Sequence, residues 1–322
     1  MSVKEKFELK LGAATREAFG KALVELGRAD SSVVVCDADL SKSTFTHLFA
    51  KEFPERFFSC GIAEANMVSI GAGLASSGKI AFVASFSAFV LNKGFEQLRV
   101  NVAYSQVPLK VVGTHSGISI GEDGPSQMSV EDLSLACSLA GFTVISPADE
   151  VATLALVKLA AYHDGPVFIR AGRVKVPIVH SPDQKFELGK AITLLKGKDM
   201  TFISTGLMVA ECIRAAEILE GEGVSAGVID IHTIKPIDRE AIAAAARTTG
   251  CIVVAEEHFT DCGLGVKVAQ VVCETNPCVM EFHGMGNFYA ESGTPEEVLT
   301  KFKMTGKDVA ETARKALGRK QK

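Results

Sequence analysis

The chain has 322 residues, which is long enough for two domains that each bury a hydrophobic core. Hydrophobic residues make up 47% of the chain and charged residues 22%, which are ordinary values for a globular protein. The formal net charge of −4 at pH 7 excludes a broad basic surface, so neither nucleic acid nor an anionic membrane is an expected partner.

Short β-branched runs alternate with alanine-rich helical patterns through the first part of the chain. Strands are expected at Val33–Cys36, Ile80–Ala84, Leu109–Gly113, Thr143–Ile145 and Val167–Arg170. Helices are expected at Thr15–Arg28, Glu64–Ser76, Lys93–Tyr104, Val130–Ala140 and Val151–Tyr162. Apolar runs without polar alternation favour strands covered on both faces, and the β-α-β order favours a parallel sheet.

The alternation stops at a polar, proline-bearing stretch from Val174 to Lys198. A second block follows, with expected strands at Thr201–Ser204, Ala226–Ile231, Cys251–Ala255 and Cys278–Phe282. Its expected helices are Val209–Glu220, Asp238–Arg247, Val266–Cys273 and a terminal helix at Asp308–Leu317. The sequence therefore predicts an α/β protein of two doubly wound domains, residues 1–190 and 191–322.

Two classes of feature are not expected. No stretch reaches the roughly 18 uninterrupted apolar residues of a membrane span, and the N-terminal MSVKEKFELKLG lacks the apolar core of a signal peptide. A cytoplasmic location is the expectation. The eight cysteines include no CxxC pair, so reduced, buried thiols are expected. The spacing of Cys251, His258, Cys262 and Cys273 fits no zinc motif, and no metal site is predicted on this chain.

Unusual residues collect where the predicted strands end. In open parallel sheets, ligands bind beyond the carboxyl ends of the strands. Here these ends carry Asp37, Asp39, Phe86, Phe89, His115, Arg170 and Arg173, and Glu64 begins a helix beside them. This edge of the first domain is the candidate site.

Each of these signals also has a simpler interpretation. Glu64, in GIAEANM, suits the first turn of a helix through the helix dipole alone. The loop HSGISIGEDGPSQM packs three glycines, two carboxylates, a histidine and a glutamine between a strand and a helix, which is typical of functional loops, although Glu122–Pro125 could form a plain surface turn. Phe86 and Phe89 could be core residues, and Arg173 could be solvated. The glycines of GAGLASSG follow no strand and match a dinucleotide fingerprint only weakly.

Taken together, the motifs resemble the C-terminal half of transketolases, most closely the branch that includes the animal enzymes. The motifs that carry the resemblance, in the order of the family, are ATREA, CDADLSKSTFT, GIAEANM, SFSAF, GTHSGISIGEDGPSQMSVEDL and FIRAGR. In the second domain, IDIHTIKPIDR and VAEEHFTDCGLG are similar to the C-terminal domain of that family. The resemblance implies a pyrimidine-binding domain for thiamine diphosphate followed by a transketolase C-terminal domain.

The resemblance also implies roles for individual residues. Glu64 matches the catalytic glutamate that bonds N1′ of the aminopyrimidine and so promotes removal of the proton from C2 of the thiazolium. Phe89 matches the residue that stacks on the pyrimidine, with Phe86 beside it. Gln127 matches a glutamine near the reacting centre where other branches carry histidine, and Asp39 matches a residue next to the cofactor.

The remaining matches concern the sugar substrate. Asp123 matches the carboxylate that bonds a hydroxyl of the donor sugar. The group that binds the sugar phosphate is matched by Arg16, Ser43, His115 and Arg173, and basic side chains with a hydroxyl suit a dianion. These matches imply ketose and aldose phosphates of the pentose phosphate pathway as substrates, although an enzyme for a branched or modified sugar would look almost the same.

Three departures from the family stand out. Ala65 replaces the glutamine that usually follows the catalytic glutamate in the animal-type branch, and the helix after Phe89 carries one extra residue around Asn92 to Gly94. The GDG-type motif that binds the diphosphate through Mg²⁺ is absent from this sequence. The resemblance therefore implies half an enzyme, which works with a separate N-terminal subunit that holds the Mg²⁺, in an α2β2 heterotetramer.

Other classes remain as alternatives. The β subunit of a 2-oxoacid dehydrogenase E1 component shares the domain order and a similar GIAE motif, but lacks the GEDGPSQM loop with His115. A deoxyxylulose-phosphate synthase carries its diphosphate domain in the same chain. A non-catalytic binding protein that kept the fold is the alternative from a different class, and the retained Glu64, His115, Asp123 and Arg173 argue against it.

Overall fold

In the computed structural model, which describes residues 2–321, the strands form a sheet of seven strands, a sheet of five and a ribbon of two. The order in the largest sheet is β12 (Thr233–Lys235), β6 (Thr143–Ile145), β7 (Val167–Arg170), β5 (Lys110–Thr114), β4 (Ile80–Phe86), β2 (Val33–Asp37) and β3 (Phe57–Ser59). Neighbours pair in parallel, except that β12 is antiparallel to β6. β2 is buried along its whole length, as its unbroken apolar run predicts.

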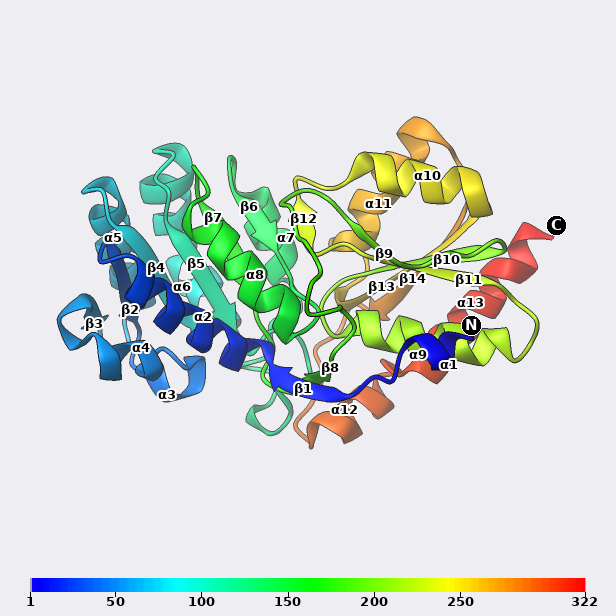
Figure 1. Ribbon diagram of the computed structural model, residues 1–322, viewed down its shortest axis with the longest axis horizontal. Coiled ribbons are helices and arrows are strands. Elements are labelled where there is room, and N and C mark those ends of the chain that lie inside the picture. The colour runs from blue at the N-terminus through cyan, green and yellow to red at the C-terminus, as the bar shows by residue number, and fades with distance from the viewer. Residues whose placement is uncertain (1, 322) are drawn as a thin grey trace.

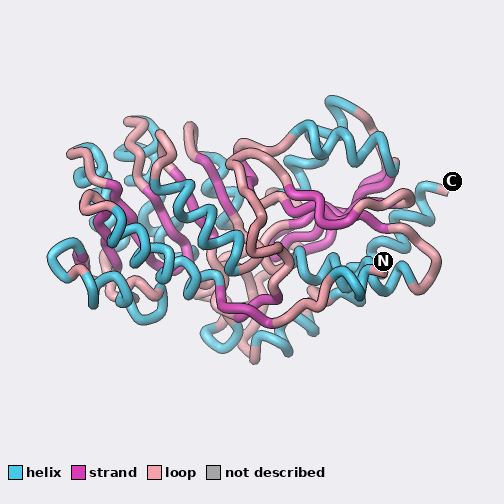
Figure 2. The backbone as a smooth tube through the Cα atoms, in the orientation of Figure 1, coloured by secondary structure: helices cyan, strands magenta, loops and turns pink. Residues whose placement is uncertain are grey.

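Helices cover both faces of this sheet (Figures 1 and 2). On one face lie α2 (Thr15–Ala29), α4 (His47–Glu52) and α8 (Glu150–Ala161), and on the other α5 (Glu64–Ser76), α6 (Ser87–Gln97) and α7 (Asp132–Ser138). Phe19 and Leu156 lie in the buried cluster of the first face, and Met67 and Leu133 in that of the second. Asp149 caps α8 by accepting a hydrogen bond from the amide of Ala152.

The second sheet is built in the same way. Its order is β14 (Val279–Met285), β13 (Cys251–Phe259), β10 (Met200–Ser204), β11 (Ala226–Asp230) and β9 (Ile192–Leu195), and β9 alone is antiparallel to its neighbour. Figure 1 shows α10 (Arg239–Thr249) and α11 (Leu264–Thr275) above this sheet, and α9 (Met208–Glu220) and α13 (Gly306–Lys320) below it. The predicted α/β class with two doubly wound sheets is confirmed.

The smaller elements were not predicted from the sequence. They are α4, β3, β9 and β12, whose bounds are given above, together with α1 (Val3–Lys6), β1 (Leu11–Ala14), α3 (Ser41–Thr44), β8 (Lys175–Pro177), α12 (Pro295–Lys301), 3-10 turns at Pro54–Arg56 and Gly121–Asp123, and a π-helical segment at Leu98–Tyr104. β1 and β8 pair with each other as the two-stranded ribbon. The helix expected to begin at Lys93 begins at Ser87 instead, directly after β4, so Phe86 is its N-cap and Phe89 lies in its first turn.

The two halves of the chain share a core. β12 lies after residue 190 but completes the sheet of the first half. The buried cluster that contains Leu133 also contains Ile229 and Ile252 from the second sheet. The division of the chain at residue 190 stays a prediction.

A buried ionic triad also joins the two halves. His180, in the connection between them, lies with Nδ1 3.1 Å from Asp149 Oδ2 and with Nε2 3.3 Å from Asp230 Oδ2, and all three side chains are fully buried. Burial works against the charged imidazole, but the hydrogen bond with Asp149 and the nearby carboxylate of Asp230 outweigh it and raise the pKa of His180 to about 9. His180 is therefore an imidazolium between two carboxylates at neutral pH.

Two further expectations can be compared with the structure. None of the helices formed by residues 2–321 combines the length and apolar character needed to cross a membrane. All eight cysteines are free, and Cys36, Cys212 and Cys251 are buried as expected. The expectation is wrong for Cys262 and Cys273, which are exposed because one lies in the turn after β13 and the other on the outer side of α11.

Candidate active site

The candidate site lies at one edge of the seven-stranded sheet. β2, β4, β5 and β7 are parallel neighbours, so their carboxyl ends meet at this edge. The strands end at Asp37, Phe86, Thr114 and Arg170. α5 follows β3 and therefore begins at the same edge, which places Glu64 there. The predicted site edge is formed as expected.

Glu64 is buried, but one oxygen of its carboxylate lacks a hydrogen-bond partner in the part of the chain that the structure describes. Its side chain is 2% exposed, and Oε2 lies 3.5 Å from Nζ of Lys93. Oε1 has no hydrogen-bond partner among the described residues. Nζ of Lys93 also lies 4.5 Å from the centroid of the Phe89 ring. Because an unpaired buried oxygen is costly, this oxygen indicates a place for a donor on a ligand. A helix cap alone does not account for it.

The two predicted phenylalanines form a stack with His115. The ring centroids of Phe86 and Phe89 lie 5.3 Å apart, and those of Phe86 and His115 lie 3.8 Å apart. Phe86 is buried in the core, as its simpler interpretation expects. Phe89 remains partly exposed and can offer a ring face to a planar ligand.

The predicted anion-binding residues converge from four parts of the chain. Nη1 of Arg16 donates hydrogen bonds to Nε2 of His115 at 2.9 Å and to the carbonyl of Ser43 at 2.8 Å. Nε of Arg16 donates to the carbonyl of Arg173 at 3.2 Å. Since Nε2 of His115 accepts, Nδ1 carries the proton and lies 2.8 Å from Oγ1 of Thr114. Ser43 contributes its carbonyl to these contacts rather than its hydroxyl.

The charge of this cluster comes from its two arginines. Burial, followed by the charges of Arg16 and Arg173, lowers the pKa of His115 to about 3, so the imidazole is neutral at physiological pH. Burial and the charge of Arg173 also lower the pKa of Arg16, which nonetheless stays protonated as arginines do in proteins. The expected set of three basic side chains therefore supplies two positive charges.

Arg173 is held in place rather than free in solvent. Its Nη1 donates to the carbonyl of Ile120 and forms an ion pair with Glu122, which the sequence did not predict as a site residue. Glu122 belongs to a 3-10 turn at Gly121–Asp123, which overlaps the alternative surface turn at Glu122–Pro125 and is anchored on the arginine. Arg173 thereby links the 115–128 loop to the end of β7.

The other three predicted residues form no hydrogen bond or ion pair with Glu64 within residues 2–321. Asp39 is exposed and has a left-handed backbone, with φ of 65°. Asp123 is exposed near Arg16, whose pKa its charge raises against the effect of burial. Gln127 is partly buried and accepts a hydrogen bond from Oγ of Ser126 at 2.5 Å. Their expected roles at a cofactor or sugar stay predictions.

Sequence reasoning missed a buried network behind the site. Nε of Arg170 lies 2.8 Å from Oδ2 of Asp132, which also accepts from Oγ of Ser87 at 2.9 Å. Nη2 of Arg170 donates to the carbonyl of Glu257 at 2.8 Å and to that of Ser129 at 3.3 Å. The signal was present in the sequence, because charged residues in buried runs such as VFIR and CIVVAEE need partners. What the sequence could not give was the identity of those partners.

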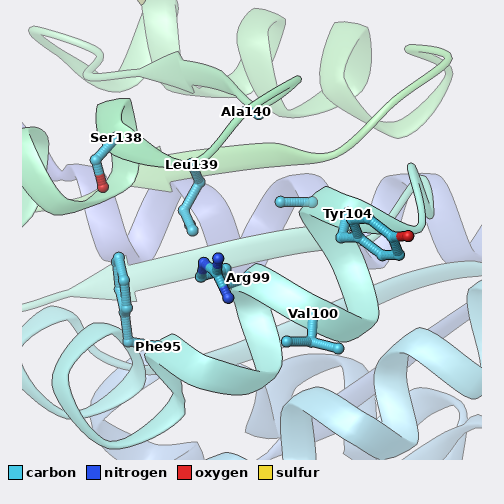
Figure 3. Close-up of a pocket in the computed structure, with 8 residues that line it drawn as sticks. Phe95, Arg99, Val100, Tyr104, Ser138, Leu139 and Ala140 are labelled. Atoms are coloured by element: carbon cyan, nitrogen blue, oxygen red, sulfur yellow. The ribbon is translucent and has the colours of Figure 1, made fainter.

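A cavity of about 530 Å³ lies apart from the predicted site residues. Figure 3 shows Phe95, Arg99 and Val100 on one side of it, and Ser138 and Leu139 on the other. It contains none of the residues predicted for the cofactor or the sugar. Among the described residues, no group of three or more His, Cys, Asp or Glu side chains is arranged to hold a metal ion.

Two family descriptions match the sequence. Residues 12–178 match "Transketolase, pyrimidine binding domain", and residues 189–309 match "Transketolase, C-terminal domain". The chain is 40% identical to human transketolase over 94% of its own length, but it covers only 48% of that enzyme.

Two other proteins match along nearly their whole length. A 6-deoxy-6-sulfo-D-fructose transketolase subunit of Clostridium sp. (strain MSTE9) is 37% identical over 98% of both chains. The solved structure described as "Split gene transketolase, inactive beta4 tetramer" is 46% identical, has a TM-score of 0.90, and is covered completely by 96% of this chain. This chain therefore belongs to the transketolase family and corresponds to its C-terminal section, the pyrimidine-binding domain followed by the C-terminal domain.

Proposed function

We propose that this chain is the C-terminal subunit of a split, thiamine-diphosphate-dependent transketolase, which moves a two-carbon ketol unit from a ketose phosphate to an aldose phosphate. The observations that carry the proposal are the buried carboxylate of Glu64, with Oε1 unpaired, and the partly exposed ring of Phe89, which both lie near Nζ of Lys93. Family membership supports the same reaction class, a transfer of aldehyde or ketone groups.

The side chains at this edge fit the aminopyrimidine half of the cofactor. The unpaired oxygen of Glu64 suits a protonated ring nitrogen, and Phe89 suits a planar ring stacked against it. Thiamine diphosphate supplies, when bound, a carbon nucleophile for the carbonyl of the donor sugar. Glu64 holds the proton at N1′, and Lys93 leaves its position over Phe89 so that the ring can enter. In this proposal Phe86 supports Phe89 from behind, while Gln127 and Asp39 face the cofactor.

The sugar substrate binds next to this position. Arg16 and Arg173 supply the positive charge for its terminal anion. Neutral His115 orients Arg16 by accepting its hydrogen bond, and the hydroxyl of Ser43 adds a polar contact without adding charge. Asp123 binds a hydroxyl of the donor. A phosphate fits two positive charges, as the pentose phosphate pathway would require, and a singly charged sulfonate fits the same cluster. The similarity to a sulfo-sugar transketolase subunit makes the sulfonate worth including in each assay.

The proposed partner is a separate N-terminal subunit that carries the diphosphate-binding domain and the ligands for Mg²⁺, in an α2β2 assembly. The support is that this chain covers only 48% of human transketolase and nearly all of a subunit and of a split-gene protein. The cytoplasm is the proposed location, since sugar phosphates are charged and remain in the compartment that makes them. Neither a 2-oxoacid dehydrogenase β subunit nor a non-catalytic binding protein is favoured by a specific observation.

The isolated chain is expected to bind thiamine diphosphate weakly and to show no transketolase activity. The reason is that the chain supplies residues for the pyrimidine, whereas the diphosphate and its metal need the partner. Calorimetry and a coupled transketolase assay, with and without the N-terminal subunit, measure both quantities. Full activity from this chain alone at cofactor concentrations of about 1 μM, near the lower end of ordinary enzyme affinities, would contradict the split-enzyme proposal.

Arg173→Ala and His115→Ala are each expected to raise KM for phosphorylated donors. A hydrogen bond to a charged group contributes about 1.5–3 kcal/mol, so the rise should be about ten- to 150-fold for Arg173. KM for hydroxypyruvate, which has no phosphate, should hardly change. Arg99→Ala serves as the matched control, because Arg99 lines the separate cavity of Figure 3. Equal losses on both donors would mean that Arg173 and His115 do not bind the phosphate.

A further inference from the structure

One acidic residue of the second half contacts the loop that carries the proposed sugar-binding residues. The amide of Ser119 donates a hydrogen bond to Oε1 of Glu257 at 2.6 Å. Glu257 lies on β13, far along the chain from the 115–128 loop, and is buried. His115 precedes Ser119 and Asp123 follows it, so this contact falls between two residues proposed to bind the donor.

The carboxylate also packs directly against the backbone of the loop. Gly117 has a φ of +77°, and a Cβ placed on it would lie 2.1 Å from Cδ of Glu257. The amide of Gly117 donates to the carbonyl of Ser129 at 2.7 Å, which closes the loop on its other side. A glycine is required here both by the backbone conformation and by the approach of the carboxylate.

Glu257 is itself rigidly held. Its carbonyl accepts a hydrogen bond from Nη2 of Arg170 at 2.8 Å, and Arg170 forms an ion pair with Asp132 that is almost completely buried. Both β13 and β7 are central strands whose residues are buried at this point. The carboxylate therefore has a fixed position from which it can hold a loop.

Glu256, the neighbouring residue in β13, has a purely structural role and serves as a comparison for Glu257. Glu256 points to the opposite face of the sheet, as successive strand residues do. Its Oε2 and Oε1 accept hydrogen bonds from the amides of Leu264 and Gly265, at 2.6 and 2.8 Å, at the start of α11. Glu256 thus caps a helix of its own domain, whereas Glu257 binds a loop of the other one.

We infer that Glu257 is a positioning residue for the donor sugar: through Ser119 and Gly117 it holds the 115–128 loop in the conformation that brings His115 and Asp123 to the substrate. This inference rests on the proposed function for its substrate, but the contact itself does not. The second domain then takes part in substrate binding without touching the substrate.

The first test is amide hydrogen exchange on the full chain, read by mass spectrometry, for wild type, Glu257→Gln and Glu256→Gln. Burial raises the pKa of Glu257 to about 7, opposed by Arg170 and Ser119, so the comparison is made at pH 8, where the carboxylate is ionised. Glu257→Gln should speed exchange about five- to tenfold within residues 116–124, because the amide oxygen accepts a neutral hydrogen bond from Ser119 in place of a charge-assisted one. Glu256→Gln should instead speed exchange at the start of α11. Unchanged exchange in the loop of Glu257→Gln would overturn the inference whatever the protein's function.

The second test uses the complex with the N-terminal subunit. Glu257→Gln should raise KM for the phosphorylated donor about five- to tenfold, while kcat and proton–deuterium exchange at C2 of the cofactor stay within about threefold of wild type. Glu256→Gln should lower stability and leave this KM unchanged. Gly117→Ala reaches the same contact from the loop, so its effect on KM and that of Glu257→Gln should be non-additive in the double variant.

An unchanged donor KM in Glu257→Gln, with a loosened loop, overturns the positioning role and leaves the transketolase proposal intact. An inactive wild-type complex overturns the proposed function. The donor sugar would then no longer be the ligand assigned to the 115–128 loop. If Glu257→Gln does not fold, Gly117→Ala supplies the same comparison from the other side of the contact.

Discussion

Glu64→Gln is expected to slow deprotonation of thiamine diphosphate at C2 by about 10²–10⁴-fold in the complex with the N-terminal subunit. The amide has nearly the same shape as the carboxylate, so the fold and sugar binding should hardly change. A neutral amide cannot share a proton with N1′ in the way that a carboxylate does. The substitution therefore removes the anionic acceptor that the unpaired Oε1 provides. Proton–deuterium exchange at C2, followed by NMR, measures the step directly, and ketol transfer should fall with it.

The matched control is Glu150→Gln. Glu150 is the first residue of α8 just as Glu64 is the first residue of α5, but its Oε2 accepts a hydrogen bond from the amide of Ala13. If both glutamates served only the dipoles of their helices, the two substitutions would have similar small effects on stability and none on exchange. If C2 exchange keeps its wild-type rate in Glu64→Gln, then Glu64 only stabilises the first turn of α5 and the proposed mechanism is wrong.

His180→Gln is expected to lower the free energy of unfolding by about 3–5 kcal/mol, the usual effect of removing one partner from a buried ion pair. The substitution leaves Asp149 and Asp230 buried without their common cation, and these two carboxylates belong to different halves of the chain. Urea titration measures the loss. His163→Gln is the control, since His163 is only partly buried and bonds a single hydroxyl, that of Thr143. Equal effects of the two substitutions would mean that the triad does not hold the halves together.

The same triad predicts how stability changes with pH. The pKa of His180 is raised to about 9 in the folded chain, above its ordinary value near 6.5. Its contribution is therefore complete below about pH 6.5 and is lost as the pH rises through about 9. The wild-type chain should lose stability between these values, and His180→Gln should lose much less. Equal pH slopes for both chains would show that His180 is not the group responsible.

The sequence predicted the features that depend on local pattern. β2 and β10 are continuous buried runs, α5 begins at Glu64 as expected, and the parallel order follows from the alternation of elements. The phenylalanines and arginines at strand ends were found because parallel strands deliver their carboxyl ends to one edge. Motif order then identified the family, whose domain descriptions match residues 12–178 and 189–309.

What the sequence could not predict depends on contacts between distant residues. β12 is only three residues long, and its partner β6 lies about ninety residues away in the chain. No local sequence pattern therefore predicts that these two strands pair. Lys93 was named only as the start of an expected helix and as part of an insertion, yet it lies near Glu64 and Phe89. The neutral state of His115 arises from burial and from the charges of Arg16 and Arg173. The residues next to His115 in the sequence predict neither its burial nor these two contacts.

The strand that the second half contributes to the first sheet also protects an edge. β12 pairs with β6 and so covers backbone groups that would otherwise be open to another chain. A fragment that ends at residue 190 would keep β6 and lose β12. Such a fragment would present an unpaired, buried-type strand, Thr143–Ile145, to its own copies. Self-association through that edge is therefore the hazard of expressing the first half alone, and the second half acts as its built-in protection against aggregation.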